Sequence, residues 1–452
     1  MSREQTMTRL IEGIARRVQE AGGRAMLVGG CVRDGLLGMP CYDIDCEVHG
    51  VGRDALRALL REFGEIDESG ESYGIFTIRG AGLDIALPRV ERRTGPGHKD
   101  FAVETDPHLS MEQAAARRDF TVNAIMRDAL TGEYVDPFGG MEDLQRGILR
   151  AVAGGQFEED PLRVLRGAQF AARFDLWPDD ETIRLMRDMP LVHLSASRVE
   201  AEMKKALMQA KKPSVFFEVL RACNQLHTWM PELENLIGVR QNPKYHPEGD
   251  AWTHTMMTLD RAAEERDAQE TPYAFMLAAL SHDLGKAESM CLDKDGVYRA
   301  AEHEVTGVPL AGSMLSRLAL GKSAITYAQE MCFLHMDVHK CYYLQKSQAQ
   351  VNLLLDRSMD PFALVRLVVC DVHGTGVPRE NAQAEEQFVM ARYDGYLRDA
   401  QKKMPSAKEL LALGVLPGRR LGGAMKRARQ LVLMGHDAGE AARLAAKEYA
   451  ES

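Results

Sequence analysis

The 452-residue chain lacks several features that would assign it to a special class of protein. No apolar run approaches the roughly 18 to 20 residues that cross a bilayer, and the N-terminus has no small-residue cleavage site. None of the 8 cysteines belongs to a Cys-x-x-Cys pair, which disfavours both a zinc ribbon and a disulfide framework. Internal repeats and low-complexity segments are also missing. We therefore expect a reduced, cytoplasmic protein with no membrane anchor and with two or three globular domains.

The chain also lacks the excess of basic residues that is typical of nucleic-acid-binding proteins, since its formal net charge is −10. Basic side chains nevertheless cluster locally, as Arg198, Lys204, Lys205, Lys211 and Lys212, and as Arg419, Arg420, Lys426, Arg427 and Arg429. Such clusters suit either phosphate contacts or solvated helix faces. Contact with RNA is therefore an open possibility from charge alone.

Strand-like segments are confined to the first third of the chain. An amphipathic helix with Leu10, Ile11, Ile14 and Val18 comes first, and helical stretches then separate the segments RAMLVGG (24–30), YDIDCEV (42–48), YGIFTIRG (73–80) and GLDIALP (82–88). Beyond residue 150, helical patterns such as PLRVLRGAQFAARF and SRVEAEMKKALMQA dominate. We predict an α/β head with a mixed sheet and helices over residues 1–150, followed by an all-α remainder. Pro-containing breaks divide that remainder into a helical neck and body over 151–240, a domain over 241–376 and a helical tail over 377–452.

Two patterns in the head suit phosphoryl chemistry. In MLVGGCVRDGLLG (26–38) a strand passes through Gly29 and Gly30 into a helix, which suits a triphosphate or an ordinary turn. In YDIDCEV the period of two places Asp43 and Asp45 on one face, where their charges repel unless a cation such as Mg²⁺ neutralises them. The pair predicts a two-metal site that activates a primer 3′-hydroxyl and binds a triphosphate. Asp84, in GLDIALP, is either a third carboxylate of this site or a strand-end residue facing water.

The head motifs resemble a known family. Gly-Gly-x-Val-Arg-Asp followed by Asp-x-Asp resembles the head of the DNA polymerase beta superfamily, in particular class II tRNA nucleotidyltransferases and bacterial poly(A) polymerases. RRDFTVNAI (117–125), DPFGGMEDL (136–144), EEDPLRVLR (158–166) and SRVEAEMKKAL (197–207) follow in the family's order. The resemblance implies that the chain adds CCA to the 3′ end of tRNA from CTP and ATP without a nucleic-acid template.

The resemblance also implies roles for individual residues. Asp43 and Asp45 would be catalytic and hold the metal ions, and the nucleotide would be bound by Gly30, Arg33, Arg118, Asp119, Asn123, Asp160, Arg163 and Arg166. Taken singly, Asp119 and Asp160 also suit helix N-caps, and Arg163 and Arg166 suit one solvated helix face.

Asp160 and Arg163 lie three residues apart, on the same side of a predicted helix. A carboxylate acceptor beside a guanidinium donor matches the amino group and ring nitrogen of cytosine or adenine and mismatches uracil and guanine. The polar segment between Arg89 and Arg118 occupies the place of the family's flexible loop, and its presence favours complete CCA addition. Gln169 stands where the family usually has arginine. The alternatives are an enzyme that adds only CC or only A, a poly(A) polymerase, and a non-catalytic tRNA-binding protein.

The helical remainder contains a second set of chemistry-bearing residues. His254, His282-Asp283 and Asp371 follow the order His…His-Asp…Asp, which resembles the HD phosphohydrolase domain. Imidazoles with carboxylates suit a divalent transition metal such as Ni²⁺ or Mn²⁺. The resemblance adds His303 and His335 as further ligands, whereas His339 and His373 are expected to be surface or core residues. Such a domain would hydrolyse a phosphomonoester or a cyclic phosphodiester, or would only support tRNA binding.

The tail segment ELLALGVLPGRRLGGAMKRARQ (409–430) resembles the tRNA-contacting tail of the same family. Pro417 and Gly418 precede a predicted helix at whose start Arg419 and Arg420 would meet a backbone phosphate. A plain helix start with solvated arginines is the alternative.

Overall fold

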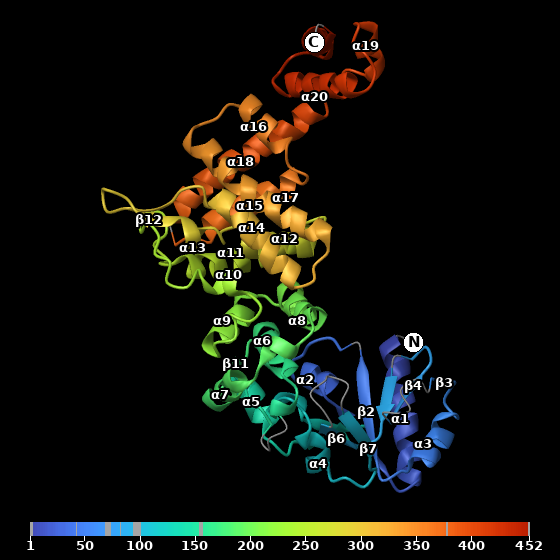
Figure 1. The fold of residues 1–452 in the computed structure, drawn as a ribbon. Coiled ribbons are helices and arrows are strands. Elements are labelled where there is room, and N and C mark those ends of the chain that lie inside the picture. Colours follow the sequence, from blue (N-terminus) through green and yellow to red (C-terminus); the bar gives the residue numbers. More distant parts are fainter. Residues whose placement is uncertain are drawn as a thin grey trace. The chain divides into compact units, whose positions relative to one another are not determined.

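The structure, a computed structural model, describes residues 3–41, 43–67, 74–81, 83–93, 101–152, 157–376 and 378–450. The chain forms two compact units. The first consists of Met1–Leu194 and Glu218–Gln225, and the second of Ser195–Phe217 and Leu226–Ser452. Figure 1 shows strands in the first third of the chain and helices through most of the rest. The predicted fold class, an α/β head followed by a helical body, is therefore confirmed.

A seven-stranded mixed sheet organises the first unit, in the order β3-β4-β5-β2-β1-β8-β9. Its strands are β1 (Arg24–Val28), β2 (Ile44–His49), β3 (Ile66–Asp67), β4 (Ile75–Ile78), β5 (Leu83–Ala86), β8 (Met126–Asp128) and β9 (Tyr134–Val135). The strand β2 lies at the centre, antiparallel to β1 and parallel to β5. The four strand-like segments predicted from the sequence correspond to β1, β2, β4 and β5.

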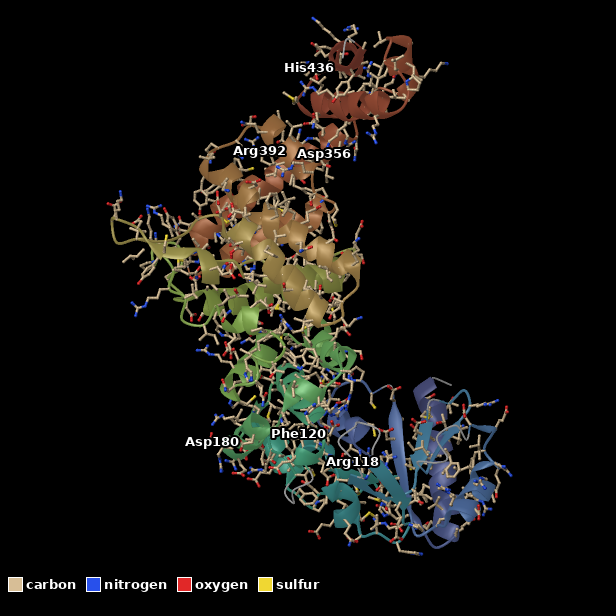
Figure 2. All side chains as sticks on the ribbon, in the orientation of Figure 1. Arg118, Phe120, Asp180, Asp356, Arg392 and His436 are labelled. Carbon is tan, nitrogen blue, oxygen red and sulfur yellow. The ribbon has the colours of Figure 1, made fainter. Side chains whose placement is uncertain are left out.

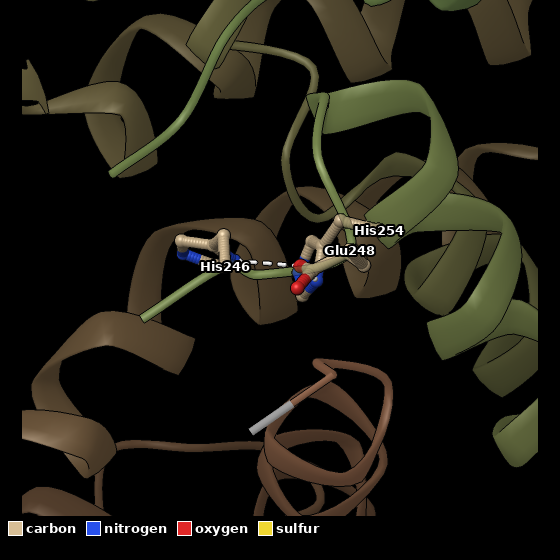
Figure 3. Close-up of side chains that lie close together, drawn as sticks. All are labelled: His246, Glu248 and His254. Carbon is tan, nitrogen blue, oxygen red and sulfur yellow. Dashed lines mark hydrogen bonds and ion pairs between the residues drawn. The ribbon is translucent and has the colours of Figure 1, made fainter. Parts of the chain in front are cut away.

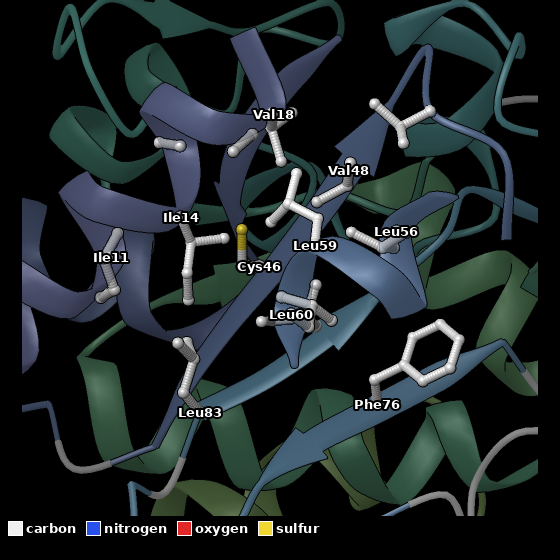
Figure 4. Close-up of a cluster of buried hydrophobic side chains, with 14 of the residues drawn as sticks. Ile11, Ile14, Val18, Cys46, Val48, Leu56, Leu59, Leu60, Phe76 and Leu83 are labelled. Atoms are coloured by element: carbon white, nitrogen blue, oxygen red, sulfur yellow. The ribbon is translucent and has the colours of Figure 1, made fainter. Parts of the chain in front are cut away.

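Two helices cover one face of this sheet. The helix α1 (Arg3–Glu20) packs Ile11, Ile14 and Val18 against the sheet, as the helical spacing of these residues predicts. The helix α3 (Arg53–Leu60) adds Leu56, Leu59 and Leu60 to the same core. From β2, Cys46 and Val48 point into this core, as Figure 4 shows.

The opposite face of the sheet carries a second core. Met26 and Val28 of β1 pack there with Ala114 and Ala115 of α4 (Met111–Ala116) and with Ala124, which follows the short helix η2 (Thr121–Asn123). Because side chains alternate along a strand, the β2 residues between Cys46 and Val48 face this side. Register agrees, since Val28 pairs with Asp45 and Met26 with Glu47.

The segment between Arg89 and Arg118 contains more regular structure than the polar loop that the sequence predicts. Antiparallel strands β6 (Arg89–Arg93) and β7 (Phe101–Thr105) lie within it, and α4 follows. Ser110 caps α4 with a capping box, because its hydroxyl accepts from the Gln113 amide while the Gln113 side chain accepts from Ser110. The expectation of a loop is therefore wrong for these described stretches; residues 94–100 lie outside the described part.

The first unit continues through short elements into one functionally important helix. These elements are α2 (Gly30–Leu36), α5 (Gly140–Arg146), β10 (Ile148–Leu149), η3 (Phe157–Glu159), α6 (Leu162–Phe174), β11 (Trp177–Pro178), α7 (Asp180–Asp188) and η4 (Leu191–His193). Phe120 is fully buried and contacts Phe157 and Phe170 edge to face, which fixes α6 beside η2. Gly167 lets α6 approach closely, because an added Cβ would lie 2.9 Å from the Phe120 ring.

The second unit is helical apart from one small hairpin, β12 (Met290–Leu292) and β13 (Tyr298–Ala300), within its described residues. Its helices are α8 (Ala196–Gln209), α10 (Pro231–Glu234), α11 (Ala251–Glu265), η5 (Arg266–Ala268), α12 (Pro272–Ser281), α13 (Lys286–Ser289), α14 (His303–Arg317), α15 (Lys322–Tyr343), α16 (Gln348–Leu355), α17 (Pro361–His373), α18 (Arg379–Ala400), α19 (Ala407–Ala412), α20 (Arg419–Leu433) and α21 (Ala438–Ala450). The helix α9 (Ser214–Ala222) is divided between the two units. Helices α19 to α21 share a small core of their own.

None of the described helices combines the length and the apolar character needed to cross a membrane. The division of the remainder at residues 240 and 377 stays a prediction.

Candidate active sites

Three carboxylates gather near the centre of the sheet in the first unit. Asp45 of β2 pairs in register with Asp84 of β5, and Asp43 directly precedes β2. The Thr77 hydroxyl donates to Asp84 at 2.6 Å, which fixes that side chain beside Asp45. Burial raises the pKa of Asp45, and Asp84 and Asp43 raise it further against the opposing effect of Arg118. A divalent cation would relieve this repulsion, so the donor set fits an oxygen-ligated metal.

An arginine and a glycine lie next to these carboxylates. Gly29 has a φ of 72°, and a Cβ placed on it would lie 3.0 Å from Nη1 of Arg118 and 3.8 Å from Oδ2 of Asp45. Glycine therefore allows both charged side chains to approach the backbone before α2. Figure 2 labels Arg118 in this part of the first unit. Gly30, which the sequence assigns to the nucleotide site, is the first residue of α2.

A chain of hydrogen bonds joins most of the predicted nucleotide-binding residues. Arg33 is 5% exposed and donates to Asn123 Oδ1 at 2.6 Å. Asn123 in turn donates to Asp119 Oδ1 at 2.8 Å. Arg166 donates to the other oxygen of Asp119 at 2.7 Å. The network thus links α2, η2 and α6, and it holds the pKa of Asp119 low: burial opposes this, but Arg166 and Asn123 outweigh it.

Arg33 has further protein partners. Its guanidinium also binds Asp34, at 2.6 and 2.9 Å, and lies 4.0 Å from the centre of the Phe174 ring. In this structure Arg33 therefore braces α2 against α6.

Asp160 and Arg163 lie at the start of α6. Asp160 accepts a hydrogen bond from the Leu162 amide at 3.1 Å, so one of its oxygens stabilises the first turn of the helix. Arg163 donates to the carbonyl of Arg117 at 2.9 Å. Both residues are partly exposed.

Gln169 is an internal residue of α6, 1% exposed. With its amide oriented to satisfy its neighbours, its oxygen accepts from Nη1 of Arg173 at 2.7 Å. Arg173 thus supplies a guanidinium one helical turn from the position where the family usually has arginine.

Two head residues escaped the sequence analysis. Glu47 follows Asp43 and Asp45 at the same spacing and is fully buried, and Arg117 donates to it at 2.8 Å. The alternation Asp-x-Asp-x-Glu and the doubled arginine of RRDFTVNAI were the available signals.

The second unit brings all six predicted HD residues together. Asp283 lies at the centre, with Oδ2 3.2 Å from His254 Nε2 and 3.3 Å from His282 Nε2. Its other oxygen lies 3.2 Å from His303 and 3.7 Å from His335. Asp371 completes the set, with Oδ1 2.9 Å from His254 Nε2. Two groups of possible metal ligands therefore share Asp283: His254, His282 and Asp283, and Asp283, His303 and His335.

Backbone carbonyls orient three of these histidines in the same way. Nδ1 of His282, His303 and His335 lies 2.6 to 2.9 Å from the carbonyl three residues earlier in the chain. Protonation of Nδ1 would satisfy these carbonyls and leave each Nε2 lone pair pointing inward. Burial, together with His303 and His282, holds the pKa of His335 well below its ordinary range, so this ring is a neutral potential ligand.

Several buried polar atoms at this centre have no hydrogen-bond partner within the described structure: both ring nitrogens of His254, Nε2 of His282 and both oxygens of Asp283. Unsatisfied buried groups are costly unless something binds them. Imidazole nitrogens facing carboxylates suit a divalent transition metal. The residues present therefore fit one or two such ions. Lys286 approaches Asp283 Oδ2 at 2.6 Å and neutralises part of its charge.

Further residues around the centre were missed from the sequence. His246 and Glu248 lie beside His254, as Figure 3 shows, and the three form another group of possible ligands. His339, expected to be a surface or core residue, bridges Asp371 and Glu385 at 2.8 and 2.7 Å. The motif His-Pro-Glu before α11 was the one visible signal.

His373 differs from His339, because it pairs with Glu386 at 2.8 Å in a partly buried position, as a structural histidine would.

A cavity of about 610 Å³ adjoins the histidine centre. Asp283, His303 and Asp371 line its floor, and Lys286 and Arg299 contribute positive charge. A cavity of this size with cations beside a metal-type ligand set suits a phosphorylated small molecule or chain end.

These features define a nucleotidyltransferase-type head joined to a helical body, and comparisons with known proteins agree. The family described as the poly A polymerase head domain matches residues 25–150. Solved CCA-adding enzymes share the fold: an apo form has a TM-score of 0.67 at 18% identity over 97% of this chain and 94% of its own. The Thermotoga maritima CCA-adding enzyme complexed with tRNA has a TM-score of 0.65 at 17% identity over 98% and 95%.

Sequence relatives are more specific. The multifunctional CCA protein of Neisseria gonorrhoeae is 40% identical over 332 residues, 73% of this chain and 77% of the relative. That of Nitrosococcus oceani is 40% identical over 323 residues, 71% and 76%. The chain belongs to the multifunctional CCA protein family, within class II of the CCA-adding enzymes.

The first prediction concerns metal content. Purified wild-type protein should contain a transition metal, and His282→Ala should lose at least about tenfold in metal affinity because Nε2 is an inward-facing ligand. Elemental analysis and metal titration would measure this. His436→Ala is the matched control, since His436 is partly exposed and pairs with Glu440. Equal metal content in the wild type and His282→Ala would contradict the site.

A second prediction concerns the metal-free protein. Burial lowers the pKa of His339, but Asp371 and Glu385 outweigh it and raise the pKa to about 10. Because this lies above the ordinary value of 6.5, the stabilisation is complete below pH 6.5 and is lost as pH rises toward 10. Thermal melting of chelator-treated protein should show this decline, and His339→Asn should show a smaller one. Identical pH profiles for both proteins would refute the assignment.

Proposed function

We propose that the protein adds CCA to the 3′ end of tRNA from CTP and ATP. The sequence relatives are named multifunctional CCA proteins, and structural neighbours are described as complexes with tRNA, ATP or CTP. The observation that carries the proposal is the pairing of Asp45 with Asp84 beside Gly29 and Arg118, in a chain of this family. These residues put negative charge for a metal next to positive charge for a triphosphate.

Asp43 and Asp45 are the proposed catalytic residues, with Asp84 as a third carboxylate. When bound there, Mg²⁺ would supply two-metal chemistry, activating the primer hydroxyl and stabilising the leaving pyrophosphate. Arg118 would bind the triphosphate, and Asp119 and Asn123 would hold the sugar side of the nucleotide. Gly30 and Arg33 would contribute through α2, with Arg33 acting from beneath in the position described above.

Nucleotide choice is assigned to Asp160, Arg163 and Arg166 at the start of α6. A carboxylate and a guanidinium side by side accept the amino group and donate to the ring nitrogen of cytosine or adenine. Uracil and guanine would leave these groups unpaired, at roughly 1 to 3 kcal/mol for each buried group. The described contacts of Asp160 and Arg163 use one carboxylate oxygen and one guanidinium nitrogen, respectively.

Complete CCA addition is favoured over CC-only or A-only addition. Both β6–β7 and α4 occupy the place of the family's flexible loop, and Arg173 with Gln169 restores a charge to α6. A poly(A) polymerase is the remaining alternative, and the histidine centre of the second unit disfavours it.

We assign a second activity, metal-dependent phosphohydrolysis of the HD type, to the histidine centre. Ni²⁺ or Mn²⁺ held by His254, His282, Asp283 and Asp371, with a second ion at His303 and His335, would supply an activated water for attack on phosphorus. Lys286 and Arg299 would attract the phosphate, because both line the adjoining cavity. Phosphomonoesters and 2′,3′-cyclic phosphodiesters are the proposed substrates.

The proposed organisation is a head over 1–150, a base-reading neck and body over 151–240, an HD domain over 241–376 and a tRNA-binding tail over 377–452. The tail has its own core, and Arg419 and Arg420 begin α20 after Pro417 and Gly418. A cytoplasmic location is proposed, because all 8 cysteines are free thiols.

A third prediction tests nucleotide choice. Asp160→Ala or Arg163→Ala should lower the preference for CTP and ATP over UTP and GTP by about tenfold or more, since one unpaired group costs about 1.4 kcal/mol. Binding of tRNA should change little. Single-nucleotide extension with each of the four triphosphates measures this. Glu158→Ala, an exposed neighbour on the same segment, is the control. Wild-type selectivity in both variants would count against the assignment.

A fourth prediction separates the two activities. Asp45→Asn should abolish tRNA extension and leave hydrolysis of a 2′,3′-cyclic nucleotide intact, because the two sites lie in different compact units. His282→Ala should do the reverse. Both assays are run on each purified variant, with circular dichroism as the check on folding. Loss of both activities in either folded variant would contradict the separation, and no extension by the wild type would contradict the main proposal.

A further inference from the structure

Glu47 is an acidic residue on the catalytic strand that the proposed chemistry does not use. It lies on the same face of β2 as Asp45, two residues further along, and is 0% exposed. Its strand partner is Met26, which belongs to the core under α4 and η2. A carboxylate in such a place is costly unless it is paired, so its partners are informative.

Two arginines compensate this charge. Arg117 donates to Glu47 Oε2 at 2.8 Å, and the guanidinium of Arg118 lies 4.0 Å from the same oxygen. On the other oxygen, His49 Nε2 makes a hydrogen bond of 3.1 Å. Despite burial, His49, Arg117 and Arg118 lower the pKa of Glu47 to about 2. Glu47 is therefore a full negative charge between two neighbouring cations.

Arg118 needs that compensation. It is buried enough that desolvation lowers its pKa, and Arg117 lowers it further by repulsion, whereas Glu47 and Asp45 oppose both effects. Its Nη1 nevertheless approaches Gly29 beside Asp45. Two adjacent guanidinium groups remain side by side in a poorly hydrated place only if an anion lies between them.

We propose that Glu47 is a positioning residue that holds Arg118 at the nucleotide site by neutralising the Arg117–Arg118 pair. The inference rests on the proposed nucleotidyl transfer at Asp43 and Asp45. Glu47 itself touches no substrate, because Arg117 and His49 occupy its oxygens. Its effect on the reaction passes through the placement of Arg118.

Glu47→Gln tests the charge without removing the hydrogen bonds. The amide oxygen can still accept from Arg117 and the amide nitrogen can still meet His49, so the fold should be retained. The two arginines lose their shared anion, and Arg118 should shift away from the site. We expect KM for both CTP and ATP to rise about tenfold, with kcat changed much less and tRNA affinity unchanged. The dissociation constant of a non-reacting CTP analogue, measured by calorimetry, should rise by the same factor.

The double variant Glu47→Gln/Arg117→Gln separates positioning from general damage. Removing Arg117 as well restores the charge balance around Arg118, so most of the lost nucleotide affinity should return. Glu65→Gln is the matched control in the same unit, because Glu65 and its partner Arg79 are both largely exposed. That control should behave as the wild type.

The outcomes are distinct. Unchanged nucleotide affinity in folded Glu47→Gln would overturn the inference, and so would a double variant weaker than the single one. If Glu47→Gln does not fold, Glu47→Asp, which keeps the charge, should retain nucleotide affinity closer to the wild type than Arg117→Gln does; the opposite order would overturn the inference. The calorimetric measurement needs no turnover, so a wild type that binds the analogue without extending tRNA would count against the proposed function alone.

Discussion

The alternation of side chains along β2 is the constraint on which the first unit depends. Cys46 and Val48 point into the core under α1 and α3, so Asp45 and Glu47 must point to the other face. The apolar core thereby fixes the direction of the charged residues. Arginines from the segment after α4 then meet this face, and the hydrogen-bonded series from Arg33 to Arg166 connects it to α6. A slip of one residue in the register of β2 would bury the metal-type carboxylates and expose the core.

The second unit solves a related problem with a different device. Asp283 is 1% exposed and would be unfavourable alone, but four histidines point Nε2 toward it from separate helical segments. Carbonyls one turn back fix three of those rings, so the orientation is built into each segment before the segments pack. Packing of α11, α12, α14, α15 and α17 then only has to bring the preset rings together.

Much of this was predictable because it is local. The strands β1, β2, β4 and β5, the helices α1, α6 and α8, and the pairing of Asp43 with Asp45 follow from periodicity over a few residues. The six HD residues followed from a resemblance in motif order. Glu47, Arg117, Glu248, His339 and Glu385 were missed because their roles come from partners far away in sequence, such as the 70 residues between Arg117 and Glu47. The burial of Arg33 against Phe174 was invisible for the same reason.

The central claim is that this chain completes tRNA 3′ ends, and product sequencing tests it most directly. Three tRNAs, ending before CCA, after the first C and after CC, are each incubated with CTP and ATP separately and together. The account predicts that all three finish as CCA with both nucleotides present and stop there, and that CTP alone gives only C additions. Failure to extend any of the three, or a run of A residues beyond CCA, would contradict it.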